Sequence, residues 1–372
     1  NTIMTKKINI AYYSTSSDTI GPFNQLVNMA LNLDRERFNI LFILSNPIIK
    51  NKEIQRLKAA DIKVFSLESG HFFNFFQLFK LIKVLKINDI DILHTRLRRC
   101  DFYGNIASIF CKCSVINNIV DNQKDHFYKF HNMFSSLLNS IYNFSLRFSK
   151  MIVVNNKANL FYYSQLGYNT HFISNGVEMD IFKKSEYYRS SIQKKHSIDR
   201  TAFNVGFVGG FKQVKGIELL SDIIRKFKNI DKINFIICGD GDYKKQEFLK
   251  EFSDYKNVHI LGYIEDMYQY YSLFNAQIYT SYSEGMSNTL LESLSCGVPA
   301  ICCNIDGYNS IVDEKCGFIV ERLSKEYVEK IVLLKNNPNL HKKISTLSIK
   351  KMETEYNFLT ISKELQKIYL SI

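Results

Sequence analysis

Short, almost wholly apolar runs alternate with longer amphipathic segments along this chain. In the first half these runs lie near residues 8–13, 38–44, 62–66, 90–94, 114–120 and 151–154. A second series follows near residues 203–208, 233–238, 258–261, 276–279, 299–302 and 317–320. Buried strands separated by helix-length segments are typical of parallel sheets with helices on both faces. The sequence therefore predicts an α/β protein built from doubly wound parallel sheets.

The length and the charge of the chain add two constraints. A chain of 372 residues is too long for one typical core and suits two α/β domains of ordinary size. The net charge is +12, and residues 1–175 hold 21 Lys and Arg against 11 Asp and Glu, while the remainder holds 27 against 25. This asymmetry points to an anionic partner for the first half, either a membrane surface or a nucleic acid.

Neither a membrane span nor a signal peptide is predicted. No apolar run approaches the roughly 18 residues that a spanning helix needs. Residues 1–7 lack the apolar stretch and cleavage site of a secretory signal. The eight cysteines form no Cys-x-x-Cys pair, so we expect free thiols in a reducing cytoplasm rather than a metal site.

The most informative stretch follows the apolar run at 276–279. It reads Ser283-Glu284-Gly285-Met286-Ser287-Asn288-Thr289-Leu290-Leu291-Glu292. Ser287 or Asn288 suits the N-cap of a helix, and the free N–H groups at such a helix start bind anions. Glu284 lies before this helix and Glu292 about a turn and a half inside it, which suits a ligand with a central phosphate and a sugar at either end. The alternative is an ordinary β-loop-α unit with two solvated glutamates.

This string resembles the EX7E motif of the family 4 retaining glycosyltransferases, which have the GT-B fold. In that family the first Glu lies beside the donor sugar and the second binds the ribose of the nucleotide. The resemblance assigns those roles to Glu284 and Glu292. It also implies donor contacts along the intervening loop and helix start, at Gly285, Met286, Ser287, Asn288, Thr289 and Leu290.

The resemblance also implies a domain organisation. A GT-B protein has two Rossmann-like doubly wound domains that face each other across a cleft, and its C-terminal helix crosses back to the first domain. Here the acceptor-binding domain would comprise residues 1–174 with the helix 356–372, and the nucleotide-sugar domain residues 175–355. The segment Asn175-Gly176-Val177-Glu178 looks like the Asn-Gly-Val-Asp segment that leads out of the first domain in this family.

A glycine-rich loop opens the second domain. The run Gly209-Gly210-Phe211-Lys212-Gln213-Val214-Lys215-Gly216 resembles the Gly-Arg-Leu-x-x-x-Lys-Gly loop of the family. Gly210 stands where the family has Arg, Lys215 matches the family's Lys, and Lys212 is a plausible substitute cation. A diphosphate leaving group needs fixed cations that neutralise its charge. The alternative for Lys215 is a solvated lysine at a helix start.

Three further positions are carried over from the resemblance. Tyr263 follows a segment similar to the one that meets the nucleobase, although an exposed Tyr at a strand end is equally compatible with it. Gly21 lies in the loop before a helix that we expect to begin at Pro22, and it matches one of the two glycines that relatives have there. A His contacts the donor sugar in relatives; here Asp121 takes roughly that place and His126, the second candidate, comes slightly later.

Basic and aromatic residues are interleaved in the first domain. Residues 71–86 place lysines on one helical face, and Arg96-Leu97-Arg98-Arg99 and residues 126–150 add further basic and aromatic side chains. Interfacial helices have this composition. A core-packed helix with a solvated lysine face explains residues 71–86 alone as well, but the charge asymmetry favours an anionic membrane over nucleic acid, for which no recognised module is present.

We therefore expect a retaining, hexosyltransferase-type enzyme with no metal and no cofactor other than its nucleotide-sugar co-substrate. Its acceptor would be a glycan or a lipid-linked glycan of a bacterial capsule or lipopolysaccharide. It would be cytoplasmic and peripheral on the inner face of the plasma membrane. The candidate catalytic residues are Glu284, Lys215 and His126. The alternatives are a GT-B sugar-nucleotide epimerase and a non-catalytic GT-B-like binding protein.

Overall fold

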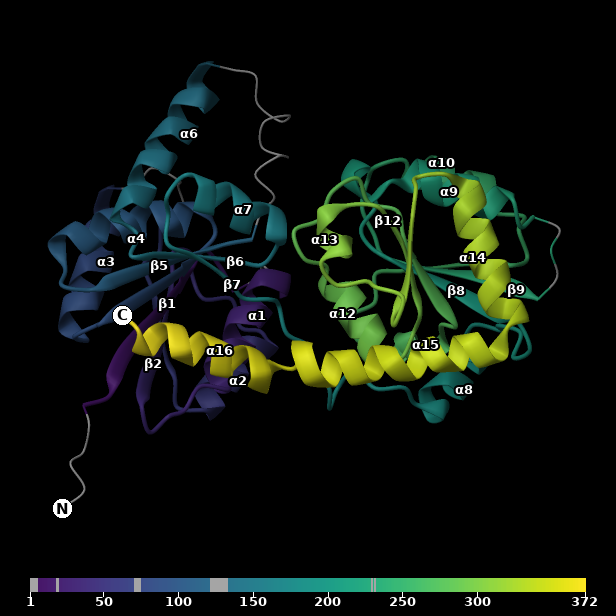
Figure 1. Ribbon diagram of the computed structural model, residues 1–372, viewed down its shortest axis with the longest axis horizontal. Helices are drawn as coiled ribbons and strands as arrows, with labels where there is room; N and C mark the ends of the chain where they lie inside the picture. Colours follow the sequence, from purple (N-terminus) through teal and green to yellow (C-terminus); the bar gives the residue numbers. More distant parts are fainter. Residues whose placement is uncertain (1–5, 18–19, 70–74, 121–132, 229, 231) are drawn as a thin grey trace. The chain divides into compact units, whose positions relative to one another are not determined.

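The structure is a computed structural model that describes the chain except for residues 1–5, 18–19, 70–74, 121–132, 229 and 231. The chain divides into two compact units. The first comprises Asn1–Gly176 and Phe358–Ile372, and the second comprises Val177–Asn357. Each unit is built around its own sheet (Figure 1).

The first unit contains a seven-stranded sheet in the order β3-β2-β1-β4-β5-β6-β7. All neighbouring strands are parallel. The strands are β1 Ile8–Ser14, β2 Phe38–Leu44, β3 Lys63–Ser66, β4 Ile92–Arg96, β5 Ser114–Ile119, β6 Met151–Val154 and β7 Thr170–Phe172. The helices are α1 Ile20–Leu31, α2 Lys52–Ala59, α3 Phe75–Ile87, α4 Arg98–Phe110, α6 Met133–Ser145, α7 Lys157–Gln165 and α16 Phe358–Leu370, with the 3-10 turn η1 Leu146–Phe148.

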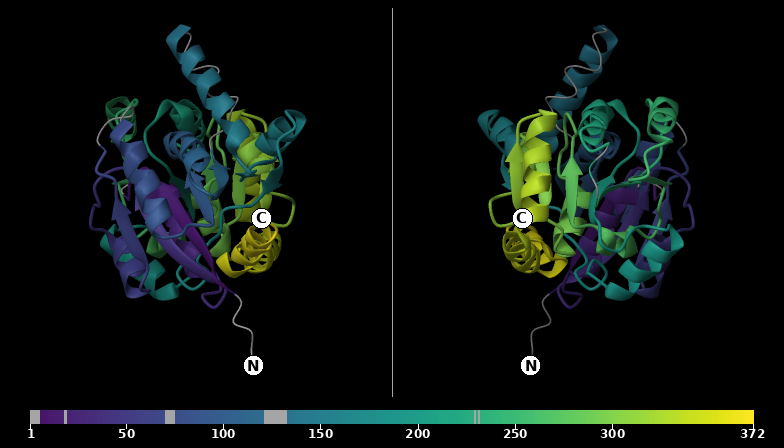
Figure 2. Two further views of the ribbon diagram at one scale, coloured as in Figure 1. Left: turned by 90° about the vertical axis from the view of Figure 1, so that its left-hand side faces the viewer. Right: turned by 90° about the vertical axis from the view of Figure 1, so that its right-hand side faces the viewer.

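Alternate residues of β1 enter two different cores, because successive side chains of a strand point to opposite faces. Ile10 and Tyr12 pack with side chains of α1, α2 and α16. Ala11 and Tyr13 pack with side chains of α3 and α4. Helices therefore cover both faces of the sheet, as Figures 1 and 2 show, and the predicted doubly wound architecture is confirmed.

The closing helix α16 belongs to the first unit. The Ser362 hydroxyl donates to the Met29 carbonyl at 3.0 Å, and the Tyr369 hydroxyl donates to the hydroxyl of Tyr12 at 2.9 Å. Tyr369 also lies 2.6 Å from Nδ1 of His94. Burial and the nearby Arg96 lower the pKa of His94 to about 3, so this imidazole is a neutral core group.

The second unit contains a six-stranded parallel sheet in the order β10-β9-β8-β11-β12-β13. Its strands are β8 Phe203–Val208, β9 Ile233–Cys238, β10 Val258–Gly262, β11 Ala276–Tyr279, β12 Ala300–Cys303 and β13 Gly317–Val320. Its helices are α8 Glu186–Lys195, α9 Ile217–Arg225, α10 Lys245–Phe252, α11 Met267–Tyr270, α12 Asn288–Ser295, α13 Asp306–Asn309, α14 Ser324–Asn336 and α15 Pro338–Lys351. The 3-10 turns η2 Gln213–Lys215 and η3 Tyr271–Leu273 and the π-helical turn η4 Met352–Tyr356 complete it.

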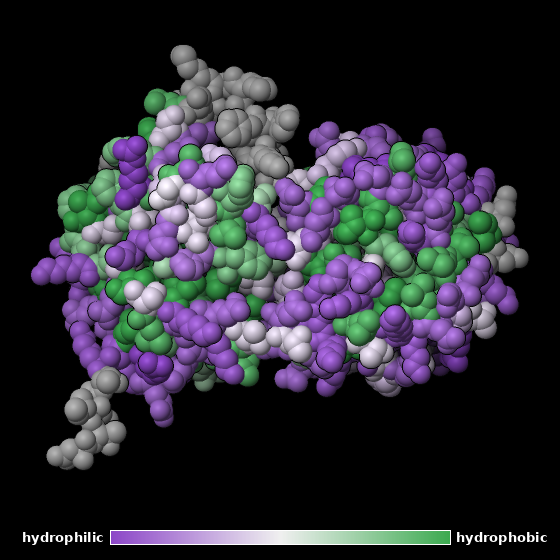
Figure 3. Space-filling view, viewed as in Figure 1, coloured by the Kyte–Doolittle hydropathy of each residue, from purple (hydrophilic) through white to green (hydrophobic). Residues whose placement is uncertain are grey.

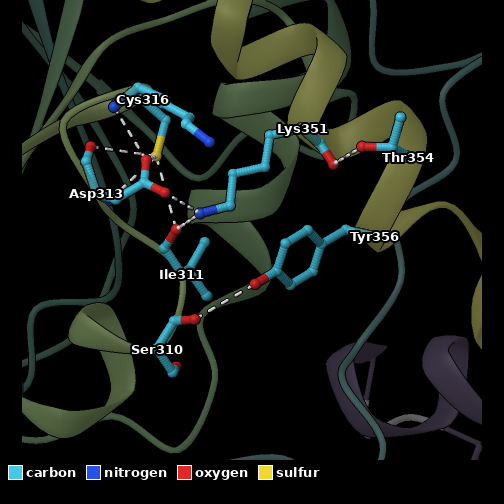
Figure 4. A network of polar contacts seen from close by, with 8 residues as sticks. Ser310, Ile311, Asp313, Cys316, Lys351, Thr354 and Tyr356 are labelled. Atoms are coloured by element: carbon cyan, nitrogen blue, oxygen red, sulfur yellow. Dashed lines mark hydrogen bonds and ion pairs between the residues drawn. The ribbon is translucent and has the colours of Figure 1, made fainter.

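A polar network holds the segment after α13 against the end of α15. The Lys351 ammonium donates to the Ile311 carbonyl at 2.6 Å and to Asp313 at 2.9 Å. The Tyr356 hydroxyl donates to the Ser310 carbonyl at 3.3 Å. Figure 4 shows these side chains converging on residues 310–313. The position of α13 is thus fixed from its C-terminal side.

Most predicted strands are confirmed, and three local expectations were incomplete. The three-residue strand β7 was not predicted. Helix α8 was not predicted either, and the Ser185 side chain accepts from the Tyr188 N–H as its N-cap. Helix α1 begins at Ile20 rather than Pro22. Proline is tolerated in a first turn because those N–H groups have no intrahelical partner.

The surface differs from the prediction at one basic cluster. Arg96 and Arg99 are buried, at 2% and 9% exposure, so they belong to no exposed basic face and that expectation was wrong for them. Arg98 instead packs over the Tyr142 ring and donates to Asn139. On the face drawn in Figure 3, hydrophobic residues of both units lie among hydrophilic ones.

Two simpler findings concern cysteines and helix length. All eight cysteines are free, and six of them are buried. Within the residues that the structure describes, no helix has the length and apolar content needed to cross a bilayer.

Candidate functional site

The site lies where β11 ends and α12 begins. β11 is wholly buried and has β8 on one side and β12 on the other, so its C-terminal end opens at the middle of the sheet. Thr280 to Ser287 form the connecting loop, and Ser287 is the N-cap residue of α12. In open α/β sheets, ligands bind outside the carboxyl ends of strands, and helix N-termini attract anions.

Glu284 and Lys215 form an ion pair at this edge. Both side chains are largely buried, at 16% and 25% exposure. The Ser281 hydroxyl donates to Oε1 of Glu284 at 2.9 Å, and the Tyr308 hydroxyl donates to Oγ of Ser281 at 3.0 Å. All four residues line one small pocket together with Ser287, Thr289, Thr280, Tyr279, Ile278, Phe207 and Val208.

The loop is fastened to the turn η2, which carries Lys215. Thr280 Oγ1 donates to the Lys215 carbonyl at 2.8 Å, and the Tyr282 N–H donates to the Val214 carbonyl at 2.8 Å. Gly216 has φ +65°, and a Cβ there would overlap the Thr280 carbonyl oxygen. Only glycine combines this left-handed conformation with so close an approach, so Gly216 allows the two loops to touch.

Arg322, two residues after the end of β13, binds the same loop. Its Nη1 donates to the carbonyls of Thr280 at 2.6 Å and Ser281 at 2.7 Å. Its guanidinium stacks 3.8 Å from the centre of the Tyr282 ring. Backbone carbonyls accept these bonds, and they fix the base of the loop that presents Glu284.

Glu292 is the fifth residue of α12, and its environment differs from that of Glu284. The Tyr271 hydroxyl donates to its Oε2 at 2.7 Å. Burial, and to a smaller extent the carboxylate of Glu178, raise the pKa of Glu292 to about 7, against the opposing effect of the Tyr271 bond. The carboxyl group therefore changes its charge near neutral pH.

The glycine-rich loop lies beside the carboxyl end of β9. The Gly209 N–H donates to the Cys238 carbonyl at 3.0 Å, and the Phe211 N–H donates to the Asp240 carbonyl at 2.9 Å. A Cβ at Gly210 would lie 3.7 Å from Cε of Lys212. The exposed Lys212 side chain thus passes beside position 210, where the loop motif that this segment resembles has an arginine.

The remaining predicted residues lie in different parts of the structure. Met286 and Leu290 are buried, so their side chains pack in the core and only their backbone remains available to a ligand. Tyr263 follows β10 and is 62% exposed. Gly21 lies in the first turn of α1 in the first unit. Asp121 and His126 lie outside the described residues.

Sequence reasoning missed four supporting residues, namely Tyr271, Ser281, Tyr308 and Arg322. Tyr271, Tyr308 and Arg322 lie 21 or more positions from the carboxylate or loop residues that they contact. Ser281 borders the predicted motif, and its position three residues before Glu284 was the one available signal. Among the described residues, no group of three His, Cys, Asp or Glu side chains is arranged to hold a metal ion.

Part of the second unit is similar to known glycosyltransferases. Residues 189–351 match the family model described as glycosyl transferases group 1. This segment carries Lys215, Glu284 and Glu292.

Relatives extend the likeness over most of the chain. An O-antigen biosynthesis glycosyltransferase, WclY of Escherichia coli, is 22% identical over 313 residues, which are 82% of this chain and 83% of that protein. The N,N'-diacetylbacillosaminyl-diphospho-undecaprenol alpha-1,3-N-acetylgalactosaminyltransferase of Campylobacter jejuni is 24% identical over 271 residues, 70% of this chain and 68% of that protein.

A solved structure of HepE from Anabaena in complex with UDP superimposes with a TM-score of 0.81 at 19% identity, over 98% of this chain and 100% of that one. The two parallel sheets and this likeness show the GT-B fold. Residues 189–351 thus resemble group 1 glycosyltransferases, and the two relatives that match over most of the chain are named as glycosyltransferases.

Proposed function

We propose that this protein is a retaining glycosyltransferase that moves a sugar from a nucleotide-diphosphate donor to a lipid-linked glycan acceptor. The observation that carries the proposal is the Lys215–Glu284 ion pair in a pocket at the N-terminus of α12, with Glu292 further along the same helix. A cation and a helix start suit a diphosphate, and the two carboxylates suit the hydroxyl groups on either side of it.

Each donor-binding group has a distinct task in this proposal. The Lys215 ammonium and the first N–H groups of α12 neutralise the diphosphate as it leaves, which stabilises the charge that develops in the transition state. Lys212 supplies a second cation beside Gly210. Glu284 orients the sugar, Glu292 accepts from the ribose, and Tyr263 contacts the base. The second unit is then the donor domain and the first unit the acceptor domain.

A membrane-bound acceptor has support in the first unit. Helix α3 exposes Phe76 and Phe79, at 77% and 68%, on the side that also carries the exposed Lys83 and Lys86. The helix α6 exposes Leu137, Ile141 and Phe144. Apolar side chains flanked by basic ones bind anionic bilayer surfaces. We place the enzyme peripherally on the cytoplasmic face of the plasma membrane, and the diphospho-undecaprenol in the name of the C. jejuni relative agrees with such an acceptor.

A calorimetric and activity screen tests the proposal. UDP is the first probe because the HepE structure contains it, and GDP and ADP follow. We expect one nucleoside diphosphate to bind, and Glu292→Ala to weaken it by about 1.5–3 kcal/mol, the usual value of a hydrogen bond to a charged group. Transfer to a diphospho-undecaprenol acceptor should retain the anomeric configuration of the donor and continue in EDTA. Conversion of the donor sugar without an acceptor would instead indicate an epimerase.

A further inference from the structure

We propose that Tyr308 and Ser281 are positioning residues that set the orientation of the Glu284 carboxylate before the donor binds. This inference rests on the proposed function, in which Glu284 orients the donor sugar. Neither residue touches the donor in this proposal. They act through Glu284. Ser281 lies in the loop after β11 and Tyr308 in the four-residue helix α13, and no sequence motif linked these two elements.

The hydrogen bonds run in one direction. The Tyr308 hydroxyl donates to Oγ of Ser281 at 3.0 Å, and Ser281 donates to Oε1 of Glu284 at 2.9 Å. Ser281 has a single hydroxyl proton. Because Tyr308 already supplies a donor to Oγ, that proton is directed at the carboxylate. Tyr308 stays protonated at any physiological pH, since burial, followed by the nearby Glu284, raises its pKa well above the ordinary value.

The two hydroxyl-bearing residues of this hydrogen-bond series are buried, and neighbouring groups hold them in place. Ser281 and Tyr308 are 3% and 1% exposed. Behind Tyr308, the network of Lys351 and Tyr356 fixes residues 310–313 (Figure 4). Beside it, Gly307 packs so tightly against the loop that a Cβ would overlap the Glu284 carbonyl oxygen. Satisfied buried networks of this kind hold one arrangement of their side chains.

The remaining contacts of Ser281 leave its hydroxyl free for this task. Its carbonyl oxygen accepts from Arg322 at 2.7 Å and from the Cys303 thiol at 2.9 Å. The backbone is therefore held by one set of groups and the hydroxyl by another. A carboxylate held in this way needs little reorientation when the substrate binds. Small displacements of the carboxylate should therefore lower the reaction rate more than the binding affinity.

Four variants test the proposal. Tyr308→Phe and Ser281→Ala should each lower kcat about ten- to a hundredfold, while UDP affinity and the KM for the donor stay within about twofold of wild type, well under the cost of a lost charged hydrogen bond. Ser281→Thr, which keeps the hydroxyl, should restore most of kcat. The matched control is Tyr369→Phe, which loses a buried bond to the Tyr12 hydroxyl, of 2.9 Å, in the core of the first unit. It should lose stability but keep kcat.

A second measurement does not depend on turnover. A double-mutant cycle of Tyr308→Phe and Glu284→Ala, followed by thermal unfolding, should show that the two changes are not additive, because each removes one end of the same series of hydrogen bonds. Additive shifts in Tm, or a kcat in Tyr308→Phe equal to that of Tyr369→Phe, would overturn the positioning role. A wild-type enzyme that binds no nucleotide and transfers no sugar would refute the proposed function instead, and the unfolding cycle would still decide whether the chain couples Tyr308 to Glu284.

Discussion

The Tyr271 hydroxyl donates to the Glu292 carboxyl over 2.7 Å, so this acid of helix α12 has an uncharged hydrogen-bond partner. Glu284, eight residues earlier, is paired with the ammonium of Lys215. The carboxylate of Glu178 adds repulsion near Glu292, and burial raises the pKa of Glu292 to about 7. The two acids of one motif thus lie in different electrostatic environments, since Glu284 faces a cation and Glu292 faces a hydroxyl and another carboxylate. Such differences allow similar groups to perform different tasks in one site.

The first prediction concerns the pH dependence that Glu292 confers. Its carboxyl titrates near 4.5 in the unfolded chain and near 7 in the folded protein. Between these values the folded protein keeps a proton that the unfolded chain has lost. The contribution to stability is therefore complete below pH 4.5 and is lost as the pH rises through 7, by roughly 3 kcal/mol in total. Thermal unfolding of wild type and Glu292→Gln at pH 5 and pH 8 measures it.

Glu292→Gln is the natural comparison because its amide oxygen still accepts from Tyr271 but cannot ionise. The stability of the variant relative to wild type should therefore increase between pH 5 and pH 8. Affinity for the nucleoside diphosphate should rise with pH more steeply in wild type, since a carboxylate accepts from a ribose hydroxyl more strongly than an amide does. Parallel profiles for the two proteins would show that Glu292 does not titrate in this range.

The second prediction separates sugar from nucleotide recognition. Glu284→Gln should bind UDP, or whichever nucleoside diphosphate the screen identifies, nearly as wild type does, because Lys215 and the start of α12 remain. It should lose most of its transfer activity, since the amide cannot form the ion pair that orients the group beside the sugar. Turnover near the wild-type rate with the true donor would contradict this role.

The sequence predicted the fold of this protein more completely than its candidate site. The strands 38–44, 151–154, 203–208, 233–238, 276–279 and 317–320 match the structure residue for residue. Buried parallel strands are nearly continuous apolar runs, so their signal is local. β7 has three residues with mixed exposure, and α8 buries mainly Ile192 and Gln193, so neither produces a clear hydrophobic period.

The candidate site was predictable only where the motif is continuous in sequence. Lys215, Glu284 and Glu292 were identified from local motifs, whereas Tyr271 and Arg322 act over long separations. No local pattern tells which distant hydroxyl or guanidinium reaches a loop, because the packing of whole elements decides it. Arg96 and Arg99 illustrate the opposite error. A run of arginines looked exposed, yet β4 ends and α4 begins there, and both side chains turn inward.

The third prediction concerns Gly307. A close contact, rather than the backbone conformation, requires a glycine at this position. A Cβ at this position would overlap the carbonyl oxygen of Glu284 and lie 2.9 Å from that of Gly285. Gly307→Ala should force the loop away from α13 and destabilise the protein by about 1–3 kcal/mol, the usual cost of overpacking. Transfer should fall further than nucleotide binding does. Gly167→Ala, at an open position with nothing within 4 Å, controls for the added methyl group, although its φ of +82° carries a strain of its own.

The last prediction is that the first unit binds anionic vesicles. Helix α3 combines two exposed phenylalanines with Lys83 and Lys86 on the same exposed side. Each basic residue near an anionic surface contributes about 1 kcal/mol, so exchanging two lysines for glutamates should cost roughly 2–4 kcal/mol. Lys83→Glu/Lys86→Glu should therefore float poorly with phosphatidylglycerol vesicles. Lys80 is left unchanged because its ammonium also donates to the Leu67 carbonyl, at 3.0 Å.

The control carries the same change of charge in the other unit, at Lys342 and Lys343, which are exposed on α15. Lys342→Glu/Lys343→Glu should float as wild type does, since net charge alone does not decide the binding if α3 is the contact. Added salt should release the wild-type protein, because screening acts within about 8–10 Å at physiological ionic strength. Phe76→Ser/Phe79→Ser should weaken the binding that persists in salt. Equal loss in the α3 and α15 variants would point to a diffuse charge effect, and a lipid-linked acceptor would then lose its structural support.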